Sequence, residues 1–132
     1  MKTLDTYKAS LIISCVFLVL FWFSPWWSYE SLDYETQSIL AFRGHGAYFS
    51  IPTILFWLYL AAMLVGYIGM FLYIKSLRTV FISATVFGIA ILPLAGLNVI
   101  TGTEAFLADI STLLAGVAIG LSFSSNVSES FH

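Results

Sequence analysis

The chain has 132 residues, of which 60% are hydrophobic and only 9% are charged, and its net charge is −2. Soluble domains carry about 25% charged residues, so this composition excludes a protein that covers its whole surface with water-facing side chains. The five scattered lysine and arginine residues exclude a nucleic-acid surface, and the single cysteine, Cys15, excludes an internal disulfide. We therefore expect an all-α integral membrane protein, with residues 1–132 forming one four-helix transmembrane bundle.

The first two apolar segments cover residues 9–27 and 51–74. Each is long enough to cross the hydrocarbon core of a bilayer, which takes about 20 helical residues. Pro25 lacks an amide hydrogen and should end or kink the first helix. Ser50 is placed to cap the second helix, with Pro52 in its first turn.

Residues 28–50 form the only substantial segment that is expected to lie outside the membrane. The segment mixes acidic and aromatic residues, so we expect an outer loop of about twenty residues that folds against the membrane surface. Within it, residues 34–42 are expected to form a short interfacial helix. Gly44 and Gly46 then indicate a turn that leads back to the membrane.

The last two apolar segments cover residues 79–97 and 104–125. Pro93 should bend the third helix, and the carbonyl that it frees four residues earlier needs a partner, because lipid offers none. Thr101 and Glu104 have the spacing of a capping box at the start of the fourth helix. A short polar stretch follows this helix.

The basic residues predict the orientation of the bundle. Lys2, Lys8, Lys75 and Arg78 fall on one side of the predicted membrane, and Arg43 alone falls on the other. Because basic residues are enriched in cytoplasmic segments, both termini are expected in the cytoplasm, N-in and C-in. Lys75 and Arg78 would bracket a very short cytoplasmic link between the second and third helices. The compactness of the chain favours a bacterial inner (plasma) membrane.

Asp109 is the only charged residue well inside an apolar segment. A carboxylate at the centre of a membrane helix costs about 2.5 to 3.5 kcal/mol, so its presence needs a reason. One interpretation is a cation or proton site that faces the bundle interior or an oligomeric pore. The other is that Asp109, about 7 to 8 Å along the helix from Glu104, reaches the outer interface near the positive end of the helix dipole. Arg43 is the expected ion-pair partner in either case.

Gly116 and Gly120 form a GxxxG motif, and Thr112 and Asp109 continue its stripe along the same helical face. Such stripes let a neighbouring helix approach closely. The motif leaves three partners open: another helix of the same chain, a second copy, or a different protein. Ala62 and Gly66 predict a second patch of close contact on the second helix.

His45 lies between two glycines in the outer loop, where it is either a solvated residue or a pH sensor. A further interpretation joins it with Arg43 in a weak site for an anionic lipid headgroup. His132 is expected on the opposite side of the membrane from His45, which excludes a paired-histidine haem site. No residues are spaced as a catalytic or metal-binding set, so we expect neither an enzyme nor a cofactor.

The sequence thus predicts a small polytopic membrane protein that acts through lateral helix contacts. It would either assemble with itself or serve as a small subunit or regulator of a larger membrane complex, with the lipid bilayer as its other partner. The alternative is a homo-oligomeric ion channel or pore, with Asp109 at its outer mouth.

Overall fold

The computed structural model describes residues 2–40, 43–45 and 52–132, and for Lys2, Leu97 and residues 43–45 it describes the backbone alone. Within these residues the α-helices are α1 (Lys2–Phe23), α2 (Pro25–Ser28), α3 (Tyr34–Leu40), α4 (Thr53–Phe71), α5 (Lys75–Ile91), α6 (Gly102–Ser122) and α7 (Ser125–Ser128). A 3-10 turn, η1 (Leu92–Leu94), follows α5. Two short strands, β1 (Arg43–His45) and β2 (Leu97–Asn98), pair antiparallel.

Four helices are long and apolar enough to cross a membrane. They cover Thr3–Phe23, Thr53–Phe71, Lys75–Leu94 and Gly102–Ser122. This confirms the predicted helical bundle with four helices of membrane-spanning length.

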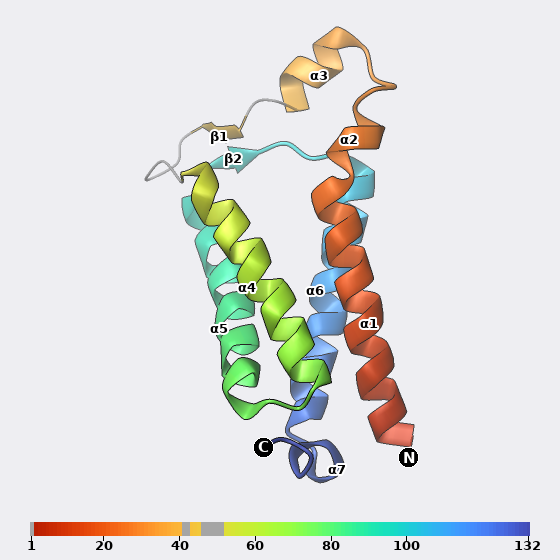
Figure 1. The fold of residues 1–132 in the computed structure, drawn as a ribbon. Helices are drawn as coiled ribbons and strands as arrows, with labels where there is room; N and C mark the ends of the chain where they lie inside the picture. The colour runs from red at the N-terminus through yellow and green to blue at the C-terminus, as the bar shows by residue number, and fades with distance from the viewer. Residues whose placement is uncertain (1, 41–42, 46–51) are drawn as a thin grey trace.

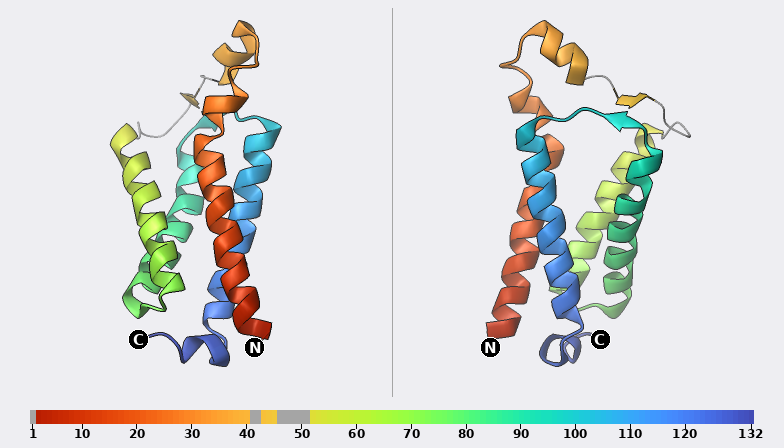
Figure 2. Two further views of the ribbon diagram at one scale, coloured as in Figure 1. Left: turned by 45° about the vertical axis from the view of Figure 1, so that its right-hand side comes forward. Right: turned by 180° about the vertical axis from the view of Figure 1, so that it is seen from behind.

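The four long helices associate as two pairs, α1 with α6 and α4 with α5. The pairs meet mainly through α1 and α4 at the end of the bundle that carries both termini, which we call the terminal end (Figures 1 and 2). They spread apart toward the opposite end, the loop end, where α3, β1 and β2 lie. Tyr7, Met70 and Phe81 are among the largest fully buried side chains and contribute to the core.

Two helices begin earlier than the hydropathy predicts. α1 begins at Lys2 rather than at residue 9, and α5 begins at Lys75 rather than at residue 79. Lys75 and Arg78 therefore lie within α5 and do not bracket a link. Lysine and arginine are good helix formers, and their apolar stems lie along a helix while their charged ends reach water. A helix thus continues beyond its apolar segment.

The prolines end helices as their chemistry requires. α1 ends at Phe23, and Pro25 begins α2, which confirms the predicted break. Pro93 lies in η1, so α5 tightens into a 3-10 turn at its end. The carbonyl of Ile89 accepts a hydrogen bond from the amide of Leu92, which satisfies the group that the proline would otherwise leave free.

The two predicted helix starts differ in outcome. Thr101 and Glu104 form the predicted capping box at the start of α6, with both reciprocal hydrogen bonds present. Helix α4 begins at Thr53, so Pro52 is its N-cap residue rather than part of its first turn. Ser50, the predicted cap, lies outside the described residues.

The outer loop forms the predicted short helix over its described part, since α3 covers Tyr34–Leu40. It lies beyond the loop end of the bundle (Figure 1). Of the expected turn, only Gly44 and His45 are described. They belong to strand β1, in which Arg43 is opposite Asn98 and His45 is opposite Leu97, whereas Gly46 lies outside the described residues. Such a short pairing leaves no alternating pattern that sequence inspection could detect.

Asp33 caps α3 and makes this helix sensitive to pH. Its carboxylate accepts hydrogen bonds from the Thr36 hydroxyl at 2.5 Å and from the Thr36 amide at 3.2 Å, and these bonds lower the pKa of Asp33. Because the pKa is lowered, the cap is fully formed at pH values above the ordinary pKa of aspartate. It is lost as the pH falls through the lowered pKa. We expect the NMR shift of the Thr36 amide to titrate below the usual aspartate range. In Asp33→Asn this titration should vanish, and its persistence would contradict the assignment.

Candidate functional site

Helix α6 has two opposite faces, and one of them is buried within the bundle. Its buried residues are Glu104, Leu107, Ser111, Ala115, Ala118 and Ser122. They recur every three or four positions, which places them on one side of the helix. The predicted stripe of Asp109, Thr112, Gly116 and Gly120 lies on the other side and is exposed. We call these four residues the glycine face.

Nothing in the described part of the chain covers the glycine face. A side-chain carbon built on Gly116 or Gly120 would meet no heavy atom of a neighbouring segment within 4 Å. Large apolar side chains are exposed around it, namely Phe106, Leu113, Val117 and Phe123. Among the described residues, the GxxxG motif therefore has no packing partner in its own chain.

The helix pair α1 and α6 is joined by two serines instead. The Ser14 hydroxyl donates to the Ser111 carbonyl at 2.7 Å, and the Ser111 hydroxyl donates to the Ser14 carbonyl at 3.0 Å. The Tyr67 hydroxyl of α4 lies 2.5 Å from the Ser14 hydroxyl and completes the group. Small side chains allow such close contact, and hydrogen bonds between helices stabilise it in lipid.

The patch predicted on α4 is used inside the chain. A side-chain carbon built on Gly66 would lie 3.0 Å from Phe81 of α5, and Gly66 is buried. Gly69, one turn further along, lies still closer to Leu77. Ala62 is half-buried. This patch therefore joins α4 to α5 and leaves Gly66 unavailable for another protein.

Asp109 does not face the interior of the bundle. Its side chain is exposed on the glycine face, and no described residue forms an ion pair or a hydrogen bond with its carboxylate. The side chain of Arg43, its expected partner, lies outside the described residues. The ion pair therefore stays a prediction, and the exposed side chain of Asp109 does not face the core of the described chain.

The carboxylate of Glu104 is buried and hydrogen-bonded within the chain. Only 2% of its surface is exposed. The Tyr29 hydroxyl donates to its two carboxylate oxygens at 2.9 and 3.1 Å, and the Thr101 amide donates to one of them at 2.7 Å. These bonds fasten the segment after α1 to the start of α6, which fits a role in positioning the helices.

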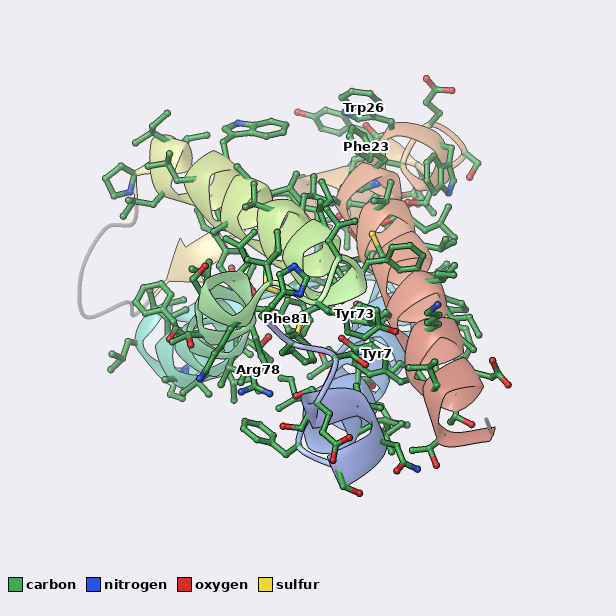
Figure 3. All side chains as sticks on the ribbon, turned by 60° about the horizontal axis from the view of Figure 1, so that its bottom comes forward. Tyr7, Phe23, Trp26, Tyr73, Arg78 and Phe81 are labelled. Carbon is green, nitrogen blue, oxygen red and sulfur yellow. The ribbon has the colours of Figure 1, made fainter. Side chains whose placement is uncertain are left out.

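The polar stretch after α6 folds back onto the terminal end, an arrangement that the sequence pattern did not predict. The guanidinium of Arg78 lies 4.7 Å from the ring centroid of Phe123 and 4.6 Å from that of Phe131. Figure 3, which looks at this end of the bundle, shows Arg78 beside the last turns of the chain. The guanidinium also donates to the Ser122 carbonyl at 3.1 Å, which satisfies one of the free carbonyls at the end of α6. Arg78 thus joins α5 to the last helices of the chain.

The backbone of this stretch is also fixed to the turn between α4 and α5. The His132 amide donates to the Tyr73 carbonyl at 3.0 Å, and the Lys75 amide donates to the His132 carbonyl at 2.9 Å. Tyr73 has a left-handed backbone with φ of 59°, a conformation that costs a residue with a side chain about 1–2 kcal/mol. In the sequence, this packing is indicated only by Val127 and Phe131, two apolar residues four positions apart in an otherwise polar stretch.

The described side chains include no group of three histidine, cysteine, aspartate or glutamate residues that would hold a metal ion. His45 belongs to β1, where only the backbone is described, so its predicted roles stay predictions. The exposed glycine face of α6 is therefore the feature of the described chain that most clearly lacks a partner. No family model, curated protein or solved structure matches this chain.

Proposed function

We propose that this chain is a non-enzymatic membrane bundle that acts by binding another transmembrane helix through the glycine face of α6. The partner helix belongs to a second copy of the chain or to a larger membrane protein. The observation that carries the proposal is the exposure of Gly116 and Gly120 on the side of α6 opposite its intramolecular contacts. Paired glycines at this spacing let two helix backbones approach closely in lipid.

A comparison with the described glycines of the other long helices supports this proposal. Gly66, Gly69 and Gly88 of α4 and α5 each lie against a side chain of the neighbouring helix. Gly116 and Gly120 have no such neighbour. A glycine inside a helix costs about 1 kcal/mol relative to alanine. A partner that needs close approach would offset this cost.

The proposed orientation has the terminal end in the cytoplasm of a bacterial inner membrane. Lys8 belongs to the first half of α1, and Lys75 and Arg78 belong to the first turn of α5. Both helices begin at the terminal end (Figure 1), and the enrichment of basic residues on the cytoplasmic side supports the assignment. Asp109 then lies in the outer half of the membrane, nearer to the loop end.

The double variant Gly116→Leu with Gly120→Leu tests the proposal. The two leucines would hold a partner backbone away, so we expect the complex extracted in mild detergent to fall to the 14.6 kDa of the single chain. The matched control is Ala61→Leu, which adds the same side chain to an exposed position of α4 and should leave the complex intact. An unchanged mass in the double variant would refute this role of the glycine face.

The second candidate function is a homo-oligomeric cation channel. It is favoured by the position of Asp109 on the same exposed face as the two glycines, because a ring of copies joined there would bring several carboxylates together at the outer mouth. Asp109→Asn should reduce the cation selectivity of reconstituted protein. The control is Asp5→Asn, an exposed acid near the terminal end. Absence of current, or current indifferent to Asp109, would eliminate the channel.

A further inference from the structure

Helices α1 and α4 leave an apolar groove between them in the half of the bundle near the terminal end. Its volume is about 330 Å³, which lies at the lower end of the range for small-molecule pockets. Its lining includes Ile12, Cys15 and Val16 of α1, Ile68 and Phe71 of α4, and Leu72, which follows α4. These segments belong to helices that are long and apolar enough to cross a membrane, and in a bilayer an apolar groove at this position would open toward lipid.

The positive charge of Lys8 is on the same side of α1 as part of the groove lining, nearer to the terminal end. Lys8 precedes Ile12 and Cys15 by four and seven positions, so the three share one stripe of α1. The Lys8 ammonium is 6.0 Å from the ring centroid of Tyr73, in the turn that follows α4. No described carboxylate forms an ion pair with Lys8. An anion at the groove mouth would therefore meet an uncompensated charge.

We propose that the groove binds one acyl chain of an anionic phospholipid and that Lys8 binds the phosphate of its headgroup. The charge of Lys8 lies toward the terminal end of the apolar groove. A phospholipid has the same arrangement, with a charged headgroup at the end of its acyl chains. A juxtamembrane lysine attracts anionic lipid, and its apolar stem can lie along the helix while its charged end reaches the headgroup region.

The dimensions of the groove favour an acyl chain over a protein helix. Its lining extends over six residues of each of the two segments, or about 9 Å, which is a little over half of one leaflet of the hydrocarbon core, itself about 15 Å thick. A helix with its side chains is about 10–12 Å wide and needs contact over several turns. A single acyl chain is narrow enough to enter between α1 and α4. This site uses neither α6 nor the glycine face, so it does not depend on the proposed function.

Native mass spectrometry of the full chain in an uncharged detergent tests this site. The protein is titrated with phosphatidylglycerol or with phosphatidylcholine, which differ in charge but carry the same acyl chains. We expect one phosphatidylglycerol to bind about fivefold more tightly than phosphatidylcholine, the contribution expected of one lysine near the surface. In Lys8→Gln this preference should disappear. Lys75→Gln, a control at the same end of the bundle, should retain it.

A second variant separates groove binding from general attraction of anionic lipid. Cys15→Phe places a ring in the groove and should abolish binding of both lipids at this site, while circular dichroism shows whether the helices are retained. Equal affinity for the two lipids in the native chain would overturn the proposal. So would an unchanged preference in Lys8→Gln, or undiminished binding in a folded Cys15→Phe protein.

Discussion

Replacement of Ser111 by leucine is expected to destabilise the bundle by about 3 kcal/mol, since added bulk in a packed core costs about 1–3 kcal/mol and loss of an interhelical hydrogen bond about 0.6–2 kcal/mol. Ser111 is 4% exposed and exchanges hydrogen bonds with Ser14. The leucine side chain would push α6 away from α1. Unfolding in mixed detergent micelles, followed by circular dichroism, measures the loss.

Two further variants show whether the effect comes from the buried face. Ser111→Ala removes the hydroxyl without adding bulk, and we expect a loss of about 1 kcal/mol. Thr112→Leu changes the neighbouring exposed residue and should alter the stability of the single chain by less than about 0.5 kcal/mol. If Thr112→Leu cost as much as Ser111→Leu, the two faces of α6 would be wrongly assigned.

Arg78→Ala is expected to release the stretch after α6 from the terminal end. Arg78 contacts Phe123 and Phe131 through its planar guanidinium and donates to the Ser122 carbonyl. Cation–π contacts are worth about 0.5–2 kcal/mol each, so we expect the docked state to weaken by about 2 kcal/mol. The amide of His132, which bonds to the neighbouring turn, should then exchange its hydrogen at least about tenfold faster.

The geometry of arginine provides the control for this prediction. Arg78→Lys keeps the charge but loses the flat surface that stacks on both rings, so its effect should be intermediate. Lys75→Ala removes an exposed side chain of the same helix and should leave His132 protected. Unchanged exchange at His132 in Arg78→Ala would show that Arg78 does not hold this stretch in place.

Local chemistry made several parts of the fold predictable. Apolar runs of membrane length identify the four long helices. Pro25 marks the end of α1, and the Thr101–Glu104 pair marks the start of α6. Both signals act between residues that are close together in the sequence. Features that depend on distant segments were not predictable in this way. The Ser14–Ser111 contact joins residues 97 positions apart, and nothing in either helix alone indicates it.

The face of α6 that packs inside the chain shows this limit most clearly. The GxxxG pattern indicates close approach, yet α1 contacts the face that carries Ser111 and Ala115, where hydroxyls and methyl groups also allow close approach. Which of two small-residue stripes a helix uses is decided by the residues of its neighbour. The same holds for the patch at Gly66, whose partner Phe81 is known only once α4 and α5 are placed.

Site-specific photo-cross-linking in native membranes tests the central claim most directly. A diazirine analogue of leucine replaces Leu113, which is 64% exposed beside the glycine face, or Leu58, which is 57% exposed on α4 and serves as control. Lateral helix contact predicts a discrete protein adduct from position 113, formed with a second copy or with another membrane protein, and none from position 58. Adducts with lipid alone at both positions would contradict the proposal that α6 binds a partner helix.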